Sequence, residues 1–245
     1  MTQPFDAGPP AIPVASRTTN VLLFDIDGTL VLTGGAGGRA MTRAFEELFA
    51  VPDAFRGIPM PGRTDPLILA DAAARAGVAL DPVIYDRFKS RYYELLRGEV
   101  PVGGPRHGVM PGVRELLDTL QGRNDVTLAL LTGNYEPAAR IKLEHFDLWR
   151  YFGFGAFGDE AADRNALVPV ALERSRASGL PHATAADLLI VGDTPLDVAC
   201  ARAGGARVVA VATGSHDVAE LSACGPDLVL SDLSDAAAFL RLLDR

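Results

Sequence analysis

Short apolar runs that end in a polar or small residue recur along the chain, and most are followed by a stretch with helical patterning. The five clearest runs are Val21 to Asp25, Val126 to Thr132, Leu188 to Asp193, Val208 to Gly214 and Leu228 to Ser231. Their apolar character is continuous rather than alternating, which is typical of strands that are covered on both faces. The pattern therefore predicts an α/β fold with a doubly wound parallel sheet and helices on each side.

Residues 36–105 interrupt this rhythm and predict a separate helical region. Three helical segments are expected there with no strand between them: Gly38–Ala50, Asp65–Gly77 and Asp81–Arg97. Stretches rich in Gly and Pro flank the region and indicate linkers. We expect an α-helical cap at residues 36–105, inserted into an α/β core of residues 19–35 and 106–245. Residues 1–18, which are rich in Pro and Ala, are predicted to form a flexible tail.

Polar side chains stand at the ends of three predicted strands, where parallel sheets bind their ligands. They are Asp25 and Asp27, Thr132, and Asp193 with Asp197. Four carboxylates at one edge of a sheet would repel one another and raise one another's pKa values. A divalent cation would relieve that repulsion, and the hard oxygen ligands favour Mg²⁺.

The first pair of carboxylates has a spacing that suits catalysis. Asp25 and Asp27 are two residues apart at a strand end, so their side chains can point the same way. One carboxylate could then attack phosphorus while the other donates and accepts a proton. Taken alone, an Asp-x-Asp-Gly sequence more often forms a strand-end turn in which Asp acts as a local cap.

Three motifs in chain order resolve that choice. Asp25-Ile-Asp27-Gly-Thr-Leu follows one strand, Thr132-Gly-Asn follows a second, and Gly192-Asp-Thr-Pro-Leu-Asp197 follows a third. In this order and strand context the chain resembles the haloacid dehalogenase-like hydrolase superfamily. Within it, the chain is most similar to the phosphoglycolate phosphatase-like members, which carry a helical cap. The resemblance extends from Asn20 to the C-terminus.

The resemblance implies a role for each acidic residue. Asp25 would be the nucleophile that becomes an aspartyl-phosphate, and Asp27 would be the general acid that later activates water. Asp25 and Asp193 would bind Mg²⁺ through their side chains, and Asp27 through its backbone carbonyl. Asp197 would support the metal site. A small phosphorylated metabolite is the implied substrate, and phosphoglycolate is the expectation from the subfamily.

The phosphate-binding residues follow from the same resemblance, with one departure. Thr132, with Gly133 and Asn134 beside it, would hold the phosphoryl oxygens. The family usually places a Lys between the second and third motifs, whereas residues 158–169 contain none. Arg164 is the best-placed cation, because its planar guanidinium can bind phosphate oxygens. A solvated arginine at a helix start is the alternative interpretation of Arg164.

Other functions remain open at this level. A phosphomutase of the same superfamily would use the same core residues, and a phosphorylation switch would use a similar acidic pocket. A dehalogenase is disfavoured, because Asp27 and the metal carboxylates suit phosphorus chemistry. Residues 35–40 fit the loose form of the dinucleotide fingerprint and residues 153–158 fit the stricter form. Both signals are weak, and they keep an NAD-dependent oxidoreductase as a distant alternative.

Composition and charge limit the kinds of molecule that the protein is expected to bind. The formal net charge is −8, which disfavours broad contact with nucleic acid or with an anionic membrane surface. The N-terminal residues lack the positive start and the apolar block of a signal peptide, so we expect a cytoplasmic protein. Arg39 and Arg63 in the predicted cap could reach an anionic substrate across the active site, although for each of them exposure to solvent is the preferred interpretation.

Overall fold

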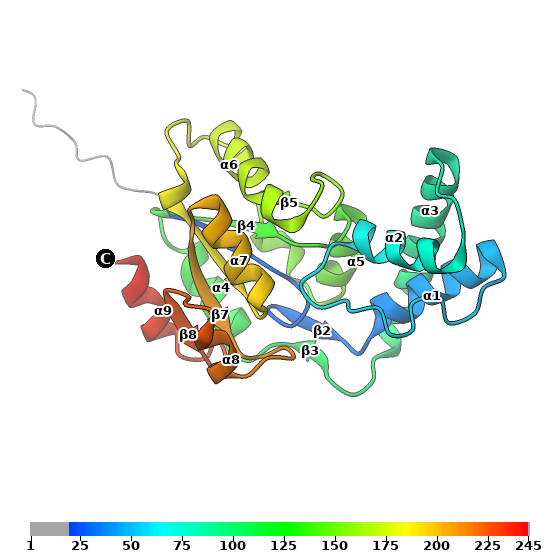
Figure 1. Ribbon diagram of the computed structural model, residues 1–245. Coiled ribbons are helices and arrows are strands. Elements are labelled where there is room, and N and C mark those ends of the chain that lie inside the picture. The colour runs from blue at the N-terminus through cyan, green and yellow to red at the C-terminus, as the bar shows by residue number, and fades with distance from the viewer. Residues whose placement is uncertain (1–19, 245) are drawn as a thin grey trace, which may run out of the picture.

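The centre of the molecule is a six-stranded parallel sheet, seen in the computed structural model of residues 20–244 (Figure 1). Its strand order is β5-β4-β1-β6-β7-β8. The strands are β1 (Asn20–Phe24), β4 (Val126–Leu131), β5 (Gly155–Ala156), β6 (Leu188–Gly192), β7 (Arg207–Val211) and β8 (Leu228–Leu230). All neighbouring pairs run parallel, so the predicted doubly wound α/β fold is confirmed.

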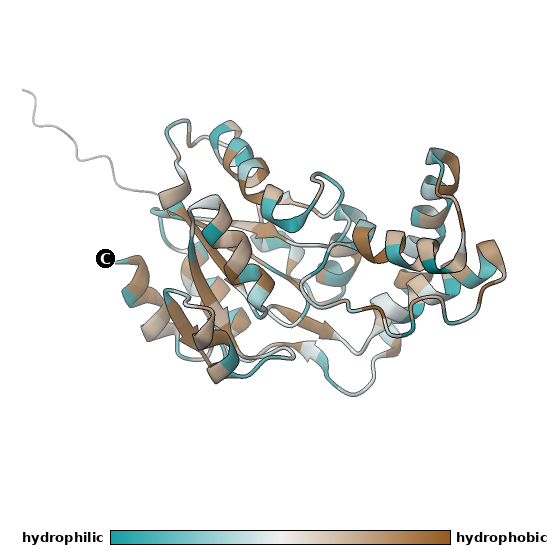
Figure 2. Cartoon of the chain, viewed as in Figure 1, coloured by the Kyte–Doolittle hydropathy of each residue, from teal (hydrophilic) through white to brown (hydrophobic). Residues whose placement is uncertain are grey.

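Helices cover both faces of this sheet. On one face α4 (Val113–Gln121), α5 (Glu136–His145) and α9 (Ala236–Leu243) pack on Leu22 and Phe24 of β1. On the other face α6 (Leu167–Ala177), α7 (Pro195–Gly204) and α8 (Val218–Ala223) pack on Val21 and Leu23. Because both faces are buried, every residue of β1 is buried, and the strands of the central sheet are mostly brown in Figure 2.

Three further helices lie together beyond one edge of the core, on the right of Figure 1. They are α1 (Ala36–Phe49), α2 (Asp65–Ala76) and α3 (Pro82–Glu99), called here the helical unit. Their buried side chains, among them Phe45, Phe88 and Tyr92, form an apolar cluster of their own. Tyr135 and Ala138 at the start of α5 complete this cluster, so the helical unit packs against the core. The division into core and cap at residues 36 and 105 stays a prediction.

A short antiparallel ribbon joins the helical unit to the core. It pairs β2 (Val31–Thr33) with β3 (His107–Val109), which are the two places where the chain crosses between the two parts. The sequence analysis did not anticipate these strands, because three residues are too few for a recognisable pattern. The ribbon brings the two linkers together at one point.

The register of the sheet sets the position of the site. Phe24 of β1 pairs with Leu130 of β4 and with Val191 of β6, so the three strands end nearly level. The polar residues that follow these strands therefore meet at one edge of the sheet.

The predicted flexible tail, residues 1–18, lies outside the described residues. Within residues 20–244, no helix is both long and apolar enough to cross a membrane.

Candidate active site

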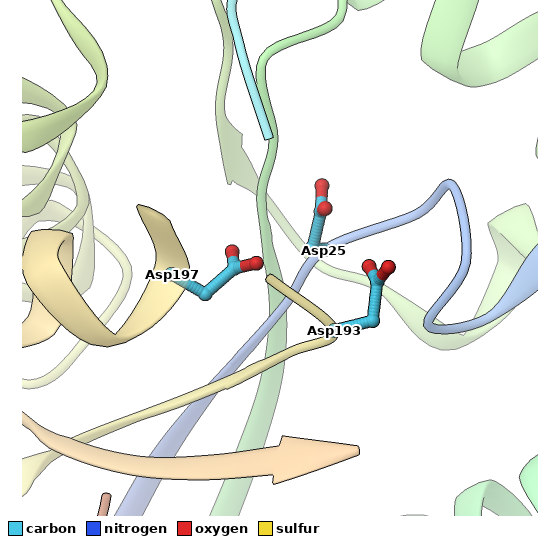
Figure 3. Close-up of side chains that lie close together, drawn as sticks. All are labelled: Asp25, Asp193 and Asp197. Carbon is cyan, nitrogen blue, oxygen red and sulfur yellow. The ribbon is translucent and has the colours of Figure 1, made fainter. Parts of the chain in front are cut away.

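Three buried aspartates converge at the carboxyl edge of the sheet (Figure 3). Asp25 follows β1, Asp193 follows β6, and Asp197 lies in the first turn of α7. Their exposed fractions are 4%, 2% and 0%, and one carboxylate oxygen of each lies within 4.8 Å of the others. The site therefore concentrates negative charge away from water.

Local structure holds each of the two later carboxylates in place. Asp197 and Thr194 form a capping box, in which the Thr194 amide and hydroxyl donate to Asp197 Oδ2 at 3.0 and 2.7 Å. The Thr29 hydroxyl donates to Asp193 Oδ1 at 3.1 Å. Gly28 and Gly214 make room for Asp193, because a Cβ at either position would lie 2.7 Å from its Cγ. Gly28 also has a φ of 90°, which other residues rarely adopt.

Arg164 is the cation inside this cluster. It lies in a 3₁₀ turn before α6 and is only 7% exposed. Its Nη2 is 3.2 Å from Asp25 Oδ2 and also donates to Asp197 Oδ1. Nη1 donates to the carbonyl of Gly62, in the segment between α1 and α2, at 3.0 Å. Arg164 is therefore not a solvated surface arginine.

One arginine does not balance three carboxylates. Burial, with Asp197 and Asp27 nearby, raises the pKa of Asp25 to about 6 although Arg164 opposes the rise. Burial, with Asp197 and Asp25 nearby, raises the pKa of Asp193 to about 8. A divalent cation among these oxygens would offset the excess negative charge, and an all-oxygen donor set suits Mg²⁺. The residues present thus fit a magnesium ion.

The loop after β4 places Thr132, Gly133 and Asn134 beside the cluster. Thr132 is fully buried, and its hydroxyl oxygen accepts hydrogen bonds from the Asn134 side chain at 2.8 Å and from the Asn134 amide at 3.3 Å. Asn134 Nδ2 also donates to Asp27 Oδ2 at 2.8 Å. At Gly133 the segment before α2 comes so close that a Cβ would lie 2.8 Å from the carbonyl carbon of Arg63. The structure thus brings the loop, both motif aspartates and the helical unit together.

Lys142 is a further charged group beside Asp27 and Asn134, and the sequence analysis did not identify it. It lies on α5, is 4% exposed, and contacts Asp27 and Asn134. The sequence does contain a feature that sets Lys142 apart, because only two of the 23 Lys and Arg residues of the chain are lysines. Lys142 also follows Ala138 and Ala139 at helical spacing, on the face of α5 that is buried.

The helical unit is attached to the loop after β4 through Asp65, the first residue of α2. The Asp65 amide donates to the carbonyl of Gly133 at 2.7 Å, and the Tyr135 amide donates to Asp65 Oδ2 at 3.0 Å. Burial raises the pKa of Asp65 to about 7, against the effect of the Lys142 charge. The sequence analysis treated Asp65 only as a helix start.

The two arginines that the sequence analysis named in the predicted cap, Arg39 and Arg63, pair with other carboxylates. Arg63 lines the cavity described below and pairs with Asp71 at 2.8 Å. Arg39 pairs with Glu99 at 2.7 Å, and its side chain is 41% exposed. Neither contacts an aspartate of the cluster.

A cavity of about 280 Å³ lies between the core and the helical unit. The core contributes most of the polar groups, α1 contributes small and flexible side chains, and Arg63 and Asp65 add charged groups from the other side. Its lining includes Asp25, Asp27, Lys142, Gly37, Met41 and Tyr92. This volume is near the lower end of the range for ligand pockets, about 300–1,000 Å³, so the cavity suits a small molecule.

Comparison with known proteins places this site in a family. The family model described as "haloacid dehalogenase-like hydrolase" matches residues 22–202, which is more than half of the chain and includes all three motifs. The chain belongs to the haloacid dehalogenase-like hydrolases. The family assignment made from the motifs is therefore confirmed, and the NAD-dependent oxidoreductase is set aside.

Individual relatives agree with this assignment. A Dickeya dadantii protein named "Probable phosphatase IndB" is 29% identical over 91% of this chain and 95% of its own length. A phosphoglycolate phosphatase of Pseudomonas syringae is 28% identical over 89% of this chain and 79% of its own length. The crystal structure of a hydrolase from Pseudomonas syringae has a TM-score of 0.65 at 22% identity over 92% of this chain and 99% of that one, which shows the same fold. The chain is an enzyme of the phosphatase class within this family.

Proposed function

We propose that the protein is a magnesium-dependent phosphatase that hydrolyses small phosphate monoesters through an aspartyl-phosphate on Asp25. The observation that carries this proposal is the buried cluster of Asp25, Asp193 and Asp197 with Arg164 inside it, facing a small cavity. Mg²⁺ bound by Asp25, Asp193 and the Asp27 carbonyl, with Asp197 in support, would neutralise charge on the phosphoryl group.

In the first step a carboxylate oxygen of Asp25 attacks phosphorus, and the bond from phosphorus to the leaving oxygen breaks. Asp27, whose side chain is 39% exposed and lines the cavity, gives the leaving oxygen a proton. In the second step Asp27 takes a proton from water, the water oxygen attacks phosphorus, and Asp25 is released with inorganic phosphate. The two steps restore both aspartates.

The other residues hold the phosphoryl group. Thr132 offers its hydroxyl hydrogen, because its oxygen already accepts two hydrogen bonds from Asn134. Gly133 and Asn134 contribute the backbone amides of the same loop, and Arg164 places its guanidinium beside the attacking oxygen of Asp25. Closure of the helical unit as a cap would exclude bulk water, and its side chains would select the substrate.

The size of the cavity and the phosphoglycolate phosphatase relatives support a small anionic monoester such as phosphoglycolate as substrate. A cytoplasmic location remains part of the proposal.

The test is release of inorganic phosphate from a panel of small phosphate monoesters, with Mg²⁺ and with EDTA, by the wild type and by Asp25→Asn. We expect turnover that needs Mg²⁺ and is lost in the variant. Phosphoryl transfer between positions of one substrate without release of phosphate would instead establish the phosphomutase. Turnover that survives Asp25→Asn would refute the proposed nucleophile.

A further inference from the structure

Lys142 is a buried ammonium at the edge of the site, and the proposed reaction leaves it without a role. It is one of two lysines in the chain, and its side chain is 5% exposed. A buried cation is costly unless it is paired and hydrogen-bonded. The groups that pair with the Lys142 ammonium therefore indicate the function of its charge.

Those partners form a closed ring of three hydrogen bonds. Lys142 Nζ donates to Asp27 Oδ2 and to Asn134 Oδ1, each at 2.6 Å. Asn134 Nδ2 donates to the same oxygen of Asp27 at 2.8 Å. The helix α5 and the loop after β4 thus hold one carboxylate oxygen from two directions.

The second carboxylate oxygen of Asp27, Oδ1, is available to a substrate. Within residues 20–244, no hydrogen bond is directed to Asp27 Oδ1, although Asp27 lines the cavity. A carboxyl group whose one oxygen is held by two donors has a restricted rotation, so its other oxygen is presented in a defined direction. That is the geometry that a proton donor to a leaving group requires.

We propose that Lys142 is a positioning residue for the acid and base Asp27. Together with Asn134 it holds Asp27 Oδ2, so that Oδ1 delivers the proton to the leaving oxygen and later accepts one from water. This inference rests on the proposed function. Lys142 acts through Asp27 and does not itself attack, protonate or release any atom of the substrate.

The dependence of the rate on the leaving group tests the proposal. We would compare kcat/KM of the wild type and Lys142→Met for p-nitrophenyl phosphate and for an alkyl phosphate. Nitrophenolate departs readily without a proton, whereas an alkoxide needs one. We expect the alkyl phosphate to lose about 10²-fold or more, in the range of general acid catalysis, and p-nitrophenyl phosphate to lose less than about 10-fold.

Two controls separate positioning from a merely structural role. Lys89→Met makes the same chemical change at the other lysine, on α3 and outside the cavity lining, and should leave both rates unchanged. In an Asp27→Asn background, Lys142→Met should cause no further loss on the alkyl phosphate, because the group that it positions is already neutralised.

An equal loss on both substrates in a variant that still unfolds cooperatively would overturn the proposal. A full loss on top of Asp27→Asn would also overturn it. Should Lys142→Met fail to fold, Lys142→Gln carries the same comparison, because it removes the charge that holds Asp27 Oδ2 and leaves a polar side chain in the buried position. If the wild type shows no Mg²⁺-dependent turnover of either substrate, the proposed function itself fails, and this inference fails with it.

Discussion

The buried carboxyl group of Asp65 makes a quantitative prediction about stability. Asp65 joins the helical unit to the loop after β4, and burial raises its pKa from 3.8 to about 7. The folded protein therefore binds the Asp65 proton more tightly than the unfolded chain does. Stability from this group is fully present below pH 3.8 and is lost as the pH rises to about 7.

The size of the effect follows from the two pKa values. At about 1.4 kcal/mol per pKa unit, ionising Asp65 in the folded state costs about 4 kcal/mol above pH 7. About 3 kcal/mol of this cost arises between pH 5 and pH 8. Asp65→Asn removes the titration, while its amide oxygen can still accept the hydrogen bond from the Tyr135 amide. The variant should therefore gain stability relative to the wild type as the pH rises.

The assay is urea unfolding of both proteins at pH 5, 6, 7 and 8 in EDTA, followed by far-UV circular dichroism. The clustered aspartates Asp25, Asp193 and Asp197 titrate in both proteins, so their contribution cancels in the difference between them. Asp86→Asn, at a carboxyl group on α3 that is 74% exposed, should show no such trend. A difference between Asp65→Asn and the wild type that is the same at pH 5 and pH 8 would refute the reasoning.

Three further predictions concern the site. Gly133→Ala should displace the segment that carries Arg63, because a Cβ would lie 2.8 Å from the Arg63 carbonyl carbon. We expect a higher KM in steady-state kinetics and a lower Tm in thermal unfolding. Unchanged values of both would contradict the close packing. Arg164→Met should lower kcat about 10²-fold or more, while Arg164→Lys keeps a charge beside Asp25 and should retain more activity, an order that phosphate-release kinetics can check. Mg²⁺ at about 100 times its Kd should stabilise the wild type by about 3 kcal/mol, and Asp193→Asn should abolish that gain in unfolding experiments.

The meeting of Asp25, Thr132 and Asp193 was predictable, because the carboxyl ends of neighbouring parallel strands lie at the same edge of a sheet. The apolar runs that end at Asp25, Thr132 and Asp193 became adjacent strands with level ends, so their neighbourhood follows from the fold class alone. The three-helix interruption was predictable for a similar reason, because no run of strand character occurs within it.

Lys142 and Asp65 were not predictable in this way. Each lies on a helix, and the position of a helix residue relative to a distant loop depends on how the helix packs. A lysine in the last turn of α5 and an aspartate at the start of α2 are ordinary on solvent-exposed helices. Only the packing of both helices against the loop after β4 turns them into buried charges.

The ribbon of β2 and β3 has a consequence for how such an enzyme can diversify. Both crossings of the chain pass through this ribbon, where Thr33 is paired with His107. Everything between these residues can be exchanged or redesigned as one module, while the clustered aspartates Asp25, Asp193 and Asp197 stay in the core. A hybrid that joins this core to a foreign helical module at the ribbon could therefore change substrate preference and keep the reaction.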